Sequence, residues 1–177
     1  MYRKDTILAK RIHKKRLELM FNIISRFNPK TVLDVGCGDG TLLISIPSKF
    51  KVDIDVNTTY AKRILDKGCI FIRADVTAPP FRDESFDLII AGEILEHITN
   101  PLSALRNLMK IVKPEHFFIV SVPNDYAWIL GKILLLRFRS IVVTLREHKH
   151  HRLGPILRSF LGKPLISRSL IFNEIYL

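Results

Sequence analysis

The feature that most constrains the fold is the stretch 31–41, which reads T-V-L-D-V-G-C-G-D-G-T. Its first five residues are β-branched or apolar apart from one acid, which is typical of a buried strand. The strand runs into three glycines at alternate positions, Gly36, Gly38 and Gly40. Because glycine has no Cβ and tolerates positive φ, such a turn lets backbone N–H groups approach a ligand closely. The stretch therefore predicts a ligand-binding loop at the end of a strand in a parallel sheet.

The spacing of these glycines argues against two kinds of nucleotide-binding loop. A dinucleotide-binding G-x-G-x-x-G loop would need a third glycine at position 41, which is Thr41. A phosphate-binding G-x-x-x-x-G-K-[ST] loop would need a lysine soon after the glycines, and the first one is Lys49. What remains is D-x-G-x-G-x-G, in which Asp34 at the strand end precedes closely spaced glycines.

Length and composition predict one globular domain. The chain has 177 residues, of which 47% are hydrophobic and 25% charged. It begins M-Y-R-K-D, without the apolar segment of a secretory leader, so we expect a cytoplasmic protein. Its two cysteines, Cys37 and Cys69, suit neither a disulfide scaffold nor a metal cluster, so we expect reduced thiols and no metal.

The net charge of +11 is unevenly distributed along the chain. Residues 1–30 carry nine basic against two acidic residues, residues 31–125 ten against thirteen, and residues 126–177 nine against two. The mildly acidic centre suits a cationic cofactor. The basic flanks permit contact with RNA, an anionic small molecule or a membrane surface, and they also fit ordinary solvated helix faces.

Helical and strand patterns alternate along the first two thirds of the chain. Strands are predicted at 31–35, 51–56, 69–73, 86–91 and 116–122, with helices at 5–27, 41–46, 60–67 and from 101 onward. Asn100 is the expected cap of the last helix, and Lys113-Pro114 its expected end. This alternation predicts an α/β fold with a Rossmann-like, doubly wound, mostly parallel sheet and helices on both faces.

Acidic residues recur where the predicted strands end. Asp55 follows the second strand, at the place where doubly wound folds hold ribose hydroxyls, and Asp53 is its rival for that role. Asp55 also fits a cap for the segment that begins at Asn57. Asp75 follows the third strand and is a candidate for ligand binding; the alternative is an ordinary surface turn residue. Because the carboxyl ends of parallel strands meet at one edge, a single crevice can collect these motifs.

Together these motifs resemble the small-molecule type of class I S-adenosylmethionine-dependent methyltransferases. The likeness rests on the glycine loop, on the D-V-N sequence at Asp55, and on A-P-P-F-R-D-E-S-F-D-L-I-I-A-G-E-I-L-E-H-I at 78–98. It covers roughly residues 13–125 and implies S-adenosylmethionine as cofactor. It also implies an antiparallel strand at the C-terminal end of the sheet. The chain departs from the usual K-P-G-G turn, because Glu115 and His116 replace the glycines.

The resemblance implies a set of cofactor-binding residues. The amino-acid part is expected at the glycine loop, the ribose after the second strand, the adenine after the third, and the methyl-bearing end after the fourth. In that order the residues are Asp34, Gly36, Cys37, Gly38 and Gly40, then Asp55 and Val56, then Asp75 and Val76, then Glu93 and Ile94.

His97 is the candidate catalytic residue, because its ordinary pKa suits a general base. The alternative is that this histidine only holds the turn. A sulfonium methyl carries its own activation, so methyl transfer requires alignment and exclusion of water more than a base.

The sequence predicts a methyltransferase for a small-molecule acceptor and leaves two alternatives open. The first is an RNA-directed methyltransferase that uses the basic flanks. The second is a regulatory protein that binds S-adenosylmethionine without catalysis. A dinucleotide-dependent oxidoreductase is disfavoured by the glycine spacing.

Residues 126–177 are expected to add a basic, apolar lid and closing strands to a core at 31–125, preceded by a basic helical segment at 1–30. The stretch 128–145 contains Lys132, Arg137 and Arg139, so it is too interrupted for a membrane span but permits peripheral contact with an anionic surface. The histidines of 148–151 lack metal-ligand spacing. Segments 165–171 and 172–177 are expected to form a closing hairpin, and the oligomeric state stays open.

Overall fold

The computed structural model describes residues 7–121 and 170–172, which form one six-stranded sheet in the order β3-β2-β1-β4-β5-β6. All five neighbouring pairs run parallel. The strands are β1 Thr31–Val35, β2 Phe50–Asp55, β3 Ile70–Arg73, β4 Phe86–Gly92, β5 Val112–Ser121 and β6 Leu170–Phe172. The predicted doubly wound, parallel sheet is confirmed.

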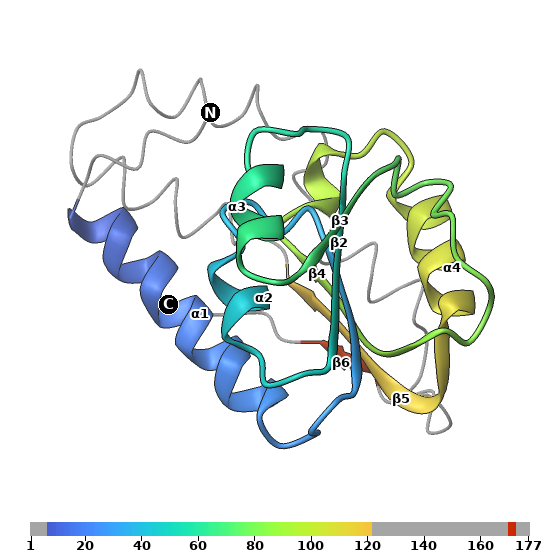
Figure 1. The fold of residues 1–177 in the computed structure, drawn as a ribbon, viewed down its shortest axis with the longest axis horizontal. Coiled ribbons are helices and arrows are strands. Elements are labelled where there is room, and N and C mark those ends of the chain that lie inside the picture. The colour runs from blue at the N-terminus through green and yellow to red at the C-terminus, as the bar shows by residue number, and fades with distance from the viewer. Residues whose placement is uncertain (1–6, 122–169, 173–177) are drawn as a thin grey trace.

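Helices cover both faces of this sheet (Figure 1). One face carries α1 (Ile7–Ile24), α2 (Thr41–Ser45) and α3 (Ala61–Asp66), and the other carries α4 (Pro101–Ile111). Two apolar cores result, one on each face. Met20 of α1 packs in the first core, and Leu105 of α4 in the second.

β1 lies at the centre and separates the two cores by the alternation of its side chains. Val32 belongs to the core under α1, whereas Leu33 and Val35 belong to the core under α4. The strand order reverses here, because the chain first adds β2 and β3 on one side and then β4 on the other. Such a switch point opens a crevice at the carboxyl ends of the strands.

The junction between α4 and β5 differs from the prediction. The helix ends at Ile111, and β5 begins at once with Val112, so the expected Lys113-Pro114 turn lies inside the span of the strand. The pairing with β4 is irregular there. Glu115 adopts φ +61°, the left-handed conformation that a glycine would otherwise supply. Glu115 therefore takes the place of a glycine of the K-P-G-G turn, with a strained backbone conformation.

The predicted antiparallel strand at the C-terminal end is wrong. β6 pairs with β5 in parallel, with Phe118 opposite Leu170 and Val120 opposite Phe172. A hairpin between 165–171 and 172–177 would need neighbouring strands of opposite direction. Instead, β6 runs in the same direction as its neighbour β5. The rest of this hairpin, the expected lid and the histidines of 148–151 lie outside the described residues.

The end of the sheet away from the crevice is fixed by the buried Asp87 of β4. Its carboxylate accepts hydrogen bonds from the backbone N–H groups of Lys30 (2.7 Å) and Thr31 (3.0 Å) and from Lys113 Nζ (2.7 Å). Burial works against ionisation, but the hydrogen bonds from Lys113, Lys30 and Thr31 hold the pKa of Asp87 below its usual value. This carboxylate therefore links the starts of β1, β4 and β5.

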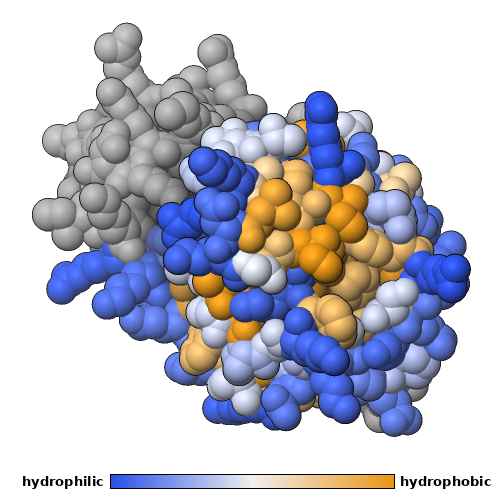
Figure 2. All heavy atoms as spheres, viewed as in Figure 1, coloured by the Kyte–Doolittle hydropathy of each residue, from blue (hydrophilic) through white to orange (hydrophobic). Residues whose placement is uncertain are grey.

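The surface seen in Figure 2 carries apolar patches bordered by hydrophilic side chains. Exposed apolar residues include Phe50, Leu65 and Ile70, from the β2–α3–β3 side of the sheet, with relative accessibilities of 48%, 55% and 47%. Among the described residues, no helix has the length and apolar character needed to cross a membrane.

Candidate active site

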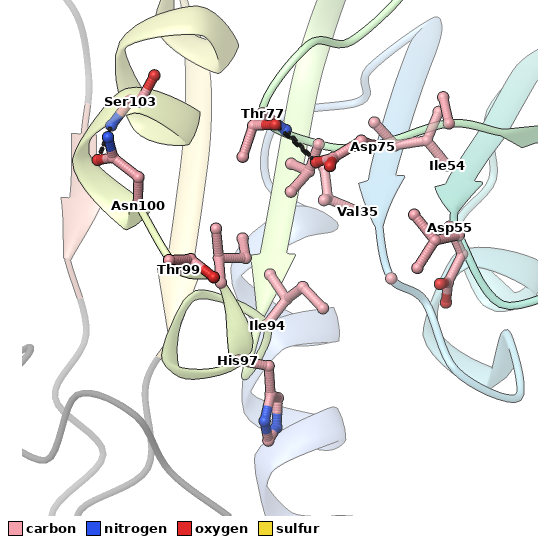
Figure 3. Close-up of a pocket in the computed structure, with 15 residues that line it drawn as sticks. Val35, Ile54, Asp55, Asp75, Thr77, Ile94, His97, Thr99, Asn100 and Ser103 are labelled. Carbon is pink, nitrogen blue, oxygen red and sulfur yellow. Dashed lines mark hydrogen bonds between the residues drawn. The ribbon is translucent and has the colours of Figure 1, made fainter.

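A cavity of about 610 Å³ lies at the carboxyl ends of β1, β2 and β3 and beside the start of α4. Figure 3 shows side chains from these elements around it. Predicted site residues that line it are Gly36, Asp55, Val56, Asp75, Val76, Ile94 and His97. Its volume falls within the range typical of small-molecule and cofactor sites.

The glycine loop borders the cavity through Gly36. The Gly36 N–H donates to the Ile54 carbonyl of β2 at 2.9 Å, and the residue has φ +67°. A Cβ on Gly36 would lie 2.8 Å from Ile94 Cδ1, so a side chain would strike the segment that follows β4. The glycine is therefore required both by its backbone conformation and by this close approach.

Gly38 has a different environment in the same loop. It has φ +59°, and a Cβ built there meets no atom within 4 Å. A side chain at this position would point into open space beside the loop. Gly38, like Cys37 and Gly40, is not among the residues that line the cavity.

Of the two acids considered for the ribose, only Asp55 lines the cavity. Its Oδ1 accepts the Asn57 N–H at 2.8 Å in a local turn, and the second oxygen is available to a ligand. The expected role of Asp55 as a helix cap is wrong, because α3 begins at Ala61, with Tyr60 at its N-cap position. Asp53 is buried and accepts the Cys37 N–H at 3.1 Å, so it supports the glycine loop from below. Burial raises the pKa of Asp53.

Asp75 lies across the cavity, in the turn that follows β3 (Figure 3). Its Oδ1 accepts the backbone N–H and the hydroxyl of Thr77, both at 2.8 Å. These hydrogen bonds lower the pKa of Asp75, so its carboxylate is held ionised and oriented. The Thr77 carbonyl in turn accepts from Asn107 Nδ2 at 2.7 Å, which ties this turn to α4.

Asp34 does not line the cavity, because it points from β1 toward α1 and is only 4% exposed. Burial and the nearby charge of Asp53 raise its pKa to about 8, although the Val35 N–H and Arg16 act in the opposite direction. With this raised pKa, the Asp34 carboxyl favours its protonated form near neutral pH.

An ion pair between Arg16 of α1 and Glu93 lies close to this buried acid. Glu93 follows β4 and does not line the cavity, whereas its neighbour Ile94 does. Sequence analysis singled out Glu93 but missed Arg16, because a single arginine within the basic run 13–16 looks like part of a solvated helix face. The signal that could have found it is the spacing of four residues that places Arg16 on the same helix face as the apolar residues Met20 and Ile24, both of which are buried.

The segment from 94 to 103 forms the remaining wall of the cavity. A short 3₁₀ helix, Leu95–His97, places His97 at the cavity, with Glu96 Oε1 at 3.9 Å from His97 Nε2. Asn100 caps α4 by accepting the Ser103 N–H at 3.1 Å, as predicted. Thr99, Asn100 and Ser103 all line the cavity, and sequence analysis did not foresee that role.

The two cysteines, Cys37 and Cys69, do not line the cavity, and within residues 7–121 both thiols are free of disulfide bonds. Burial is the main cause that raises the pKa of both thiols. Nearby aspartates act in the same direction, whereas the charge of Lys51 opposes the shift at Cys69. In the same part of the chain, no three His, Cys, Asp or Glu side chains are grouped as metal ligands would be.

Comparison with known proteins identifies the family. Residues 33–120 match a family described as "Methyltransferase domain". A ubiquinone biosynthesis O-methyltransferase from Rickettsia conorii is 32% identical over 135 residues, which is 69% of this chain and 46% of that protein. A tRNA (carboxymethyluridine(34)-5-O)-methyltransferase from Arabidopsis thaliana is 33% identical over 94 residues, which is 51% of this chain and 23% of that protein. The chain thus spans less than half the length of these two relatives.

The fold agrees with this family. The crystal structure of N-methyltransferase NodS from Bradyrhizobium japonicum WM9, in complex with S-adenosyl-L-homocysteine, superposes with a TM-score of 0.58 at 21% identity. The match covers 73% of this chain and 70% of that one. The described residues therefore carry a domain of the class I S-adenosylmethionine-dependent methyltransferase family.

Proposed function

We propose that this protein is an S-adenosylmethionine-dependent methyltransferase that methylates a small-molecule acceptor. One observation carries the proposal: a single cavity at the switch point of the sheet collects Gly36, Asp55 and Asp75, each from the end of a different parallel strand. Carboxylates can accept hydrogen bonds from ribose hydroxyls and from an exocyclic amine. The residues present thus fit an adenosine ligand.

In this proposal each part of the cofactor has its own group of residues. Asp55 accepts from the ribose hydroxyls, and Asp75 accepts from the adenine amine while the Val76 N–H donates to a ring nitrogen. Asp34 and the backbone of the glycine loop hold the amino-acid part, since a buried acid with a raised pKa gains most from a cationic partner. Bound S-adenosylmethionine supplies an activated methyl group on its sulfonium.

The contribution of the protein to methyl transfer is mainly positional. The walls formed by Ile94, Ile98 and Val35 exclude water from one side of the cavity, and the polar groups fix the donor relative to the acceptor. His97 lies at the cavity with about two fifths of its side chain exposed, so it is placed to take a proton from an acceptor hydroxyl. We assign it that role in the proposal.

A small-molecule acceptor is supported by the Rickettsia relative, which is named for ubiquinone biosynthesis. An RNA acceptor is the second candidate, because another relative is named as a tRNA methyltransferase and because Arg11, Lys14 and Lys15 of α1 are exposed. Binding to RNA through such residues would be sequence-independent and would weaken steeply with salt.

Calorimetric titration with S-adenosylmethionine, S-adenosylhomocysteine and NADH tests the cofactor. We expect micromolar binding of the first two and none of NADH. Absence of binding in a folded sample would refute the proposal. Transfer of a labelled methyl group from the cofactor to small-molecule extracts or to bulk tRNA then separates the two acceptor classes, and binding without any transfer would favour the regulatory alternative.

A further inference from the structure

The ion pair between Arg16 and Glu93 joins two parts of the chain that border the candidate site. Arg16 comes from α1 and Glu93 from the segment after β4. Their side chains are 14% and 31% exposed, so the pair is largely withdrawn from solvent. His13 Nδ1 lies 3.0 Å from a second guanidinium nitrogen and helps to hold Arg16 in place.

The pair lies next to the candidate site without lining its cavity. Glu93 immediately precedes Ile94, which lines the cavity and packs against Gly36. The charge of Arg16 also acts on the buried Asp34 beneath the glycine loop. A cationic group and a buried acid therefore lie close together behind the wall formed by Gly36 and Ile94.

The backbone conformation of Glu93 is further evidence that its side chain is held in place at Arg16. Glu93 has φ +53°, which is uncommon for a residue with a side chain. Its N–H donates to the Ser121 carbonyl at 2.9 Å, and its carboxylate reaches Arg16. Strained residues of this kind persist where surrounding contacts hold them, and they gather at ligand sites and switches.

We propose that Glu93 occupies, on Arg16, the position that the carboxylate of the cofactor's amino-acid part takes on binding. This inference rests on the proposed function. On binding, the ligand carboxylate replaces Glu93 at the guanidinium and the ligand ammonium faces Asp34, while Glu93 turns toward solvent. The ion pair thus competes with the cofactor and keeps the charge of Arg16 compensated when the site is empty.

The exchange is favourable on electrostatic grounds. A largely buried guanidinium needs an anionic partner in both states, because leaving a buried charge uncompensated is costly. A carboxylate exchanged for another carboxylate keeps that compensation. Glu93, at nearly one third exposure, recovers solvation when it leaves. The ligand therefore gains only the difference between two similar ion pairs, so the exchange costs little and the net contribution of Arg16 to affinity is modest.

Two ligands test this exchange by calorimetry: S-adenosylhomocysteine, and 5′-methylthioadenosine, which has the adenosine part without the amino acid. We expect Arg16→Gln to weaken binding of the first by only about five-fold and to leave the second unchanged, since the ligand loses the difference between its own contact with Arg16 and the Glu93 pair that it replaces. We expect Glu93→Gln to tighten S-adenosylhomocysteine binding by about three-fold, because the competitor is weakened. Matched controls are Lys15→Gln on exposed α1 and Glu84→Gln, which also has positive φ but lies outside the cavity wall.

The outcomes separate the two claims. Equal weakening of both ligands by Arg16→Gln, or weaker S-adenosylhomocysteine binding by Glu93→Gln, would overturn the exchange. Failure of the unmodified protein to bind either ligand would instead refute the proposed function. If thermal melting shows that Arg16→Gln does not fold, Arg16→Lys replaces it, with about two-fold weaker S-adenosylhomocysteine binding expected, because lysine lacks the planar fork but would pair with either carboxylate.

Discussion

Replacement of Asp34 by Asn should stabilise the protein and weaken cofactor binding. Asp34 is 4% exposed, and burial together with Asp53 raises its pKa to about 8. In the unfolded chain the same carboxyl ionises with a pKa of about 4. At pH values between these two pKa values, the Asp34 carboxyl is protonated in the folded protein and ionised in the unfolded chain.

The sign of the effect follows from proton linkage. Because the unfolded state binds fewer protons than the folded state between pH 4 and 8, the free energy of unfolding falls as pH rises through that window. The slope is about 1.4 kcal/mol per pH unit for one group, so a window of about four units corresponds to roughly 6 kcal/mol at most. The Asp34→Asn variant has no carboxyl to titrate at this position, so it would avoid this loss.

Urea denaturation followed by circular dichroism at pH 5, 6, 7 and 8 measures the effect. The difference in free energy of unfolding, variant minus wild type, should grow with pH up to about pH 8 and then level off. Asp66→Asn on the exposed face of α3 is the control for removal of a surface carboxylate. A difference that does not change with pH, or that shrinks as pH rises, would show that Asp34 is ionised in the folded protein.

The same group links cofactor binding to pH. If the ligand ammonium lies beside Asp34, binding ionises the carboxyl and releases a proton. Affinity for S-adenosylmethionine should then rise between pH 5.5 and 7, by up to about ten-fold per unit. Calorimetry in buffers of different ionisation enthalpy counts the released proton, and uptake of a proton would contradict this assignment.

Three further substitutions test the site and its support. Gly38→Val should weaken S-adenosylmethionine binding more than about ten-fold in a folded protein, as measured by calorimetry. The control is Gly68→Val, which should not weaken binding; Gly68 also has a left-handed φ, and a Cβ built there likewise meets no atom within 4 Å. Asp55→Ala should weaken binding by roughly ten- to thirty-fold by loss of the ribose contact, and unchanged binding would reassign that site. Asp87→Ala should destabilise the protein by about 2–4 kcal/mol in urea without affecting binding; because the pKa of Asp87 is lowered, its stabilisation should be present above about pH 4 and lost below it.

Local sequence patterns were sufficient for the parallel core. The run before Gly36 predicted the central strand, because a buried parallel strand needs apolar side chains on both faces. The placement of Asp55 and Asp75 at strand ends brought both to one cavity, since the carboxyl ends of parallel strands share an edge. These features depend on contacts close in sequence or on a general property of the fold.

Features that depend on pairing between distant segments were not predictable. The parallel direction of β6 relative to β5 depends on pairing between segments far apart in the chain, which no local pattern specifies. The partnership of Arg16 with Glu93 joins residues far apart in the chain, and charge patterning alone cannot choose one arginine among neighbouring basic residues. The strain at Glu115 likewise follows from an irregular register with β4.

The charged residues near the glycine loop affect which kind of ligand the site would favour. Two buried acids, Asp34 and Asp53, lie beneath the loop, and burial raises the pKa of both. An uncharged ligand would leave that electrostatic cost in place, whereas a ligand with an ammonium or sulfonium group would relieve it. A carboxylate beside the ammonium would in turn need Arg16. Under the proposed function, these charges would therefore favour a ligand that carries both signs of charge, such as an amino-acid-bearing nucleoside, over a simple nucleoside or a dinucleotide.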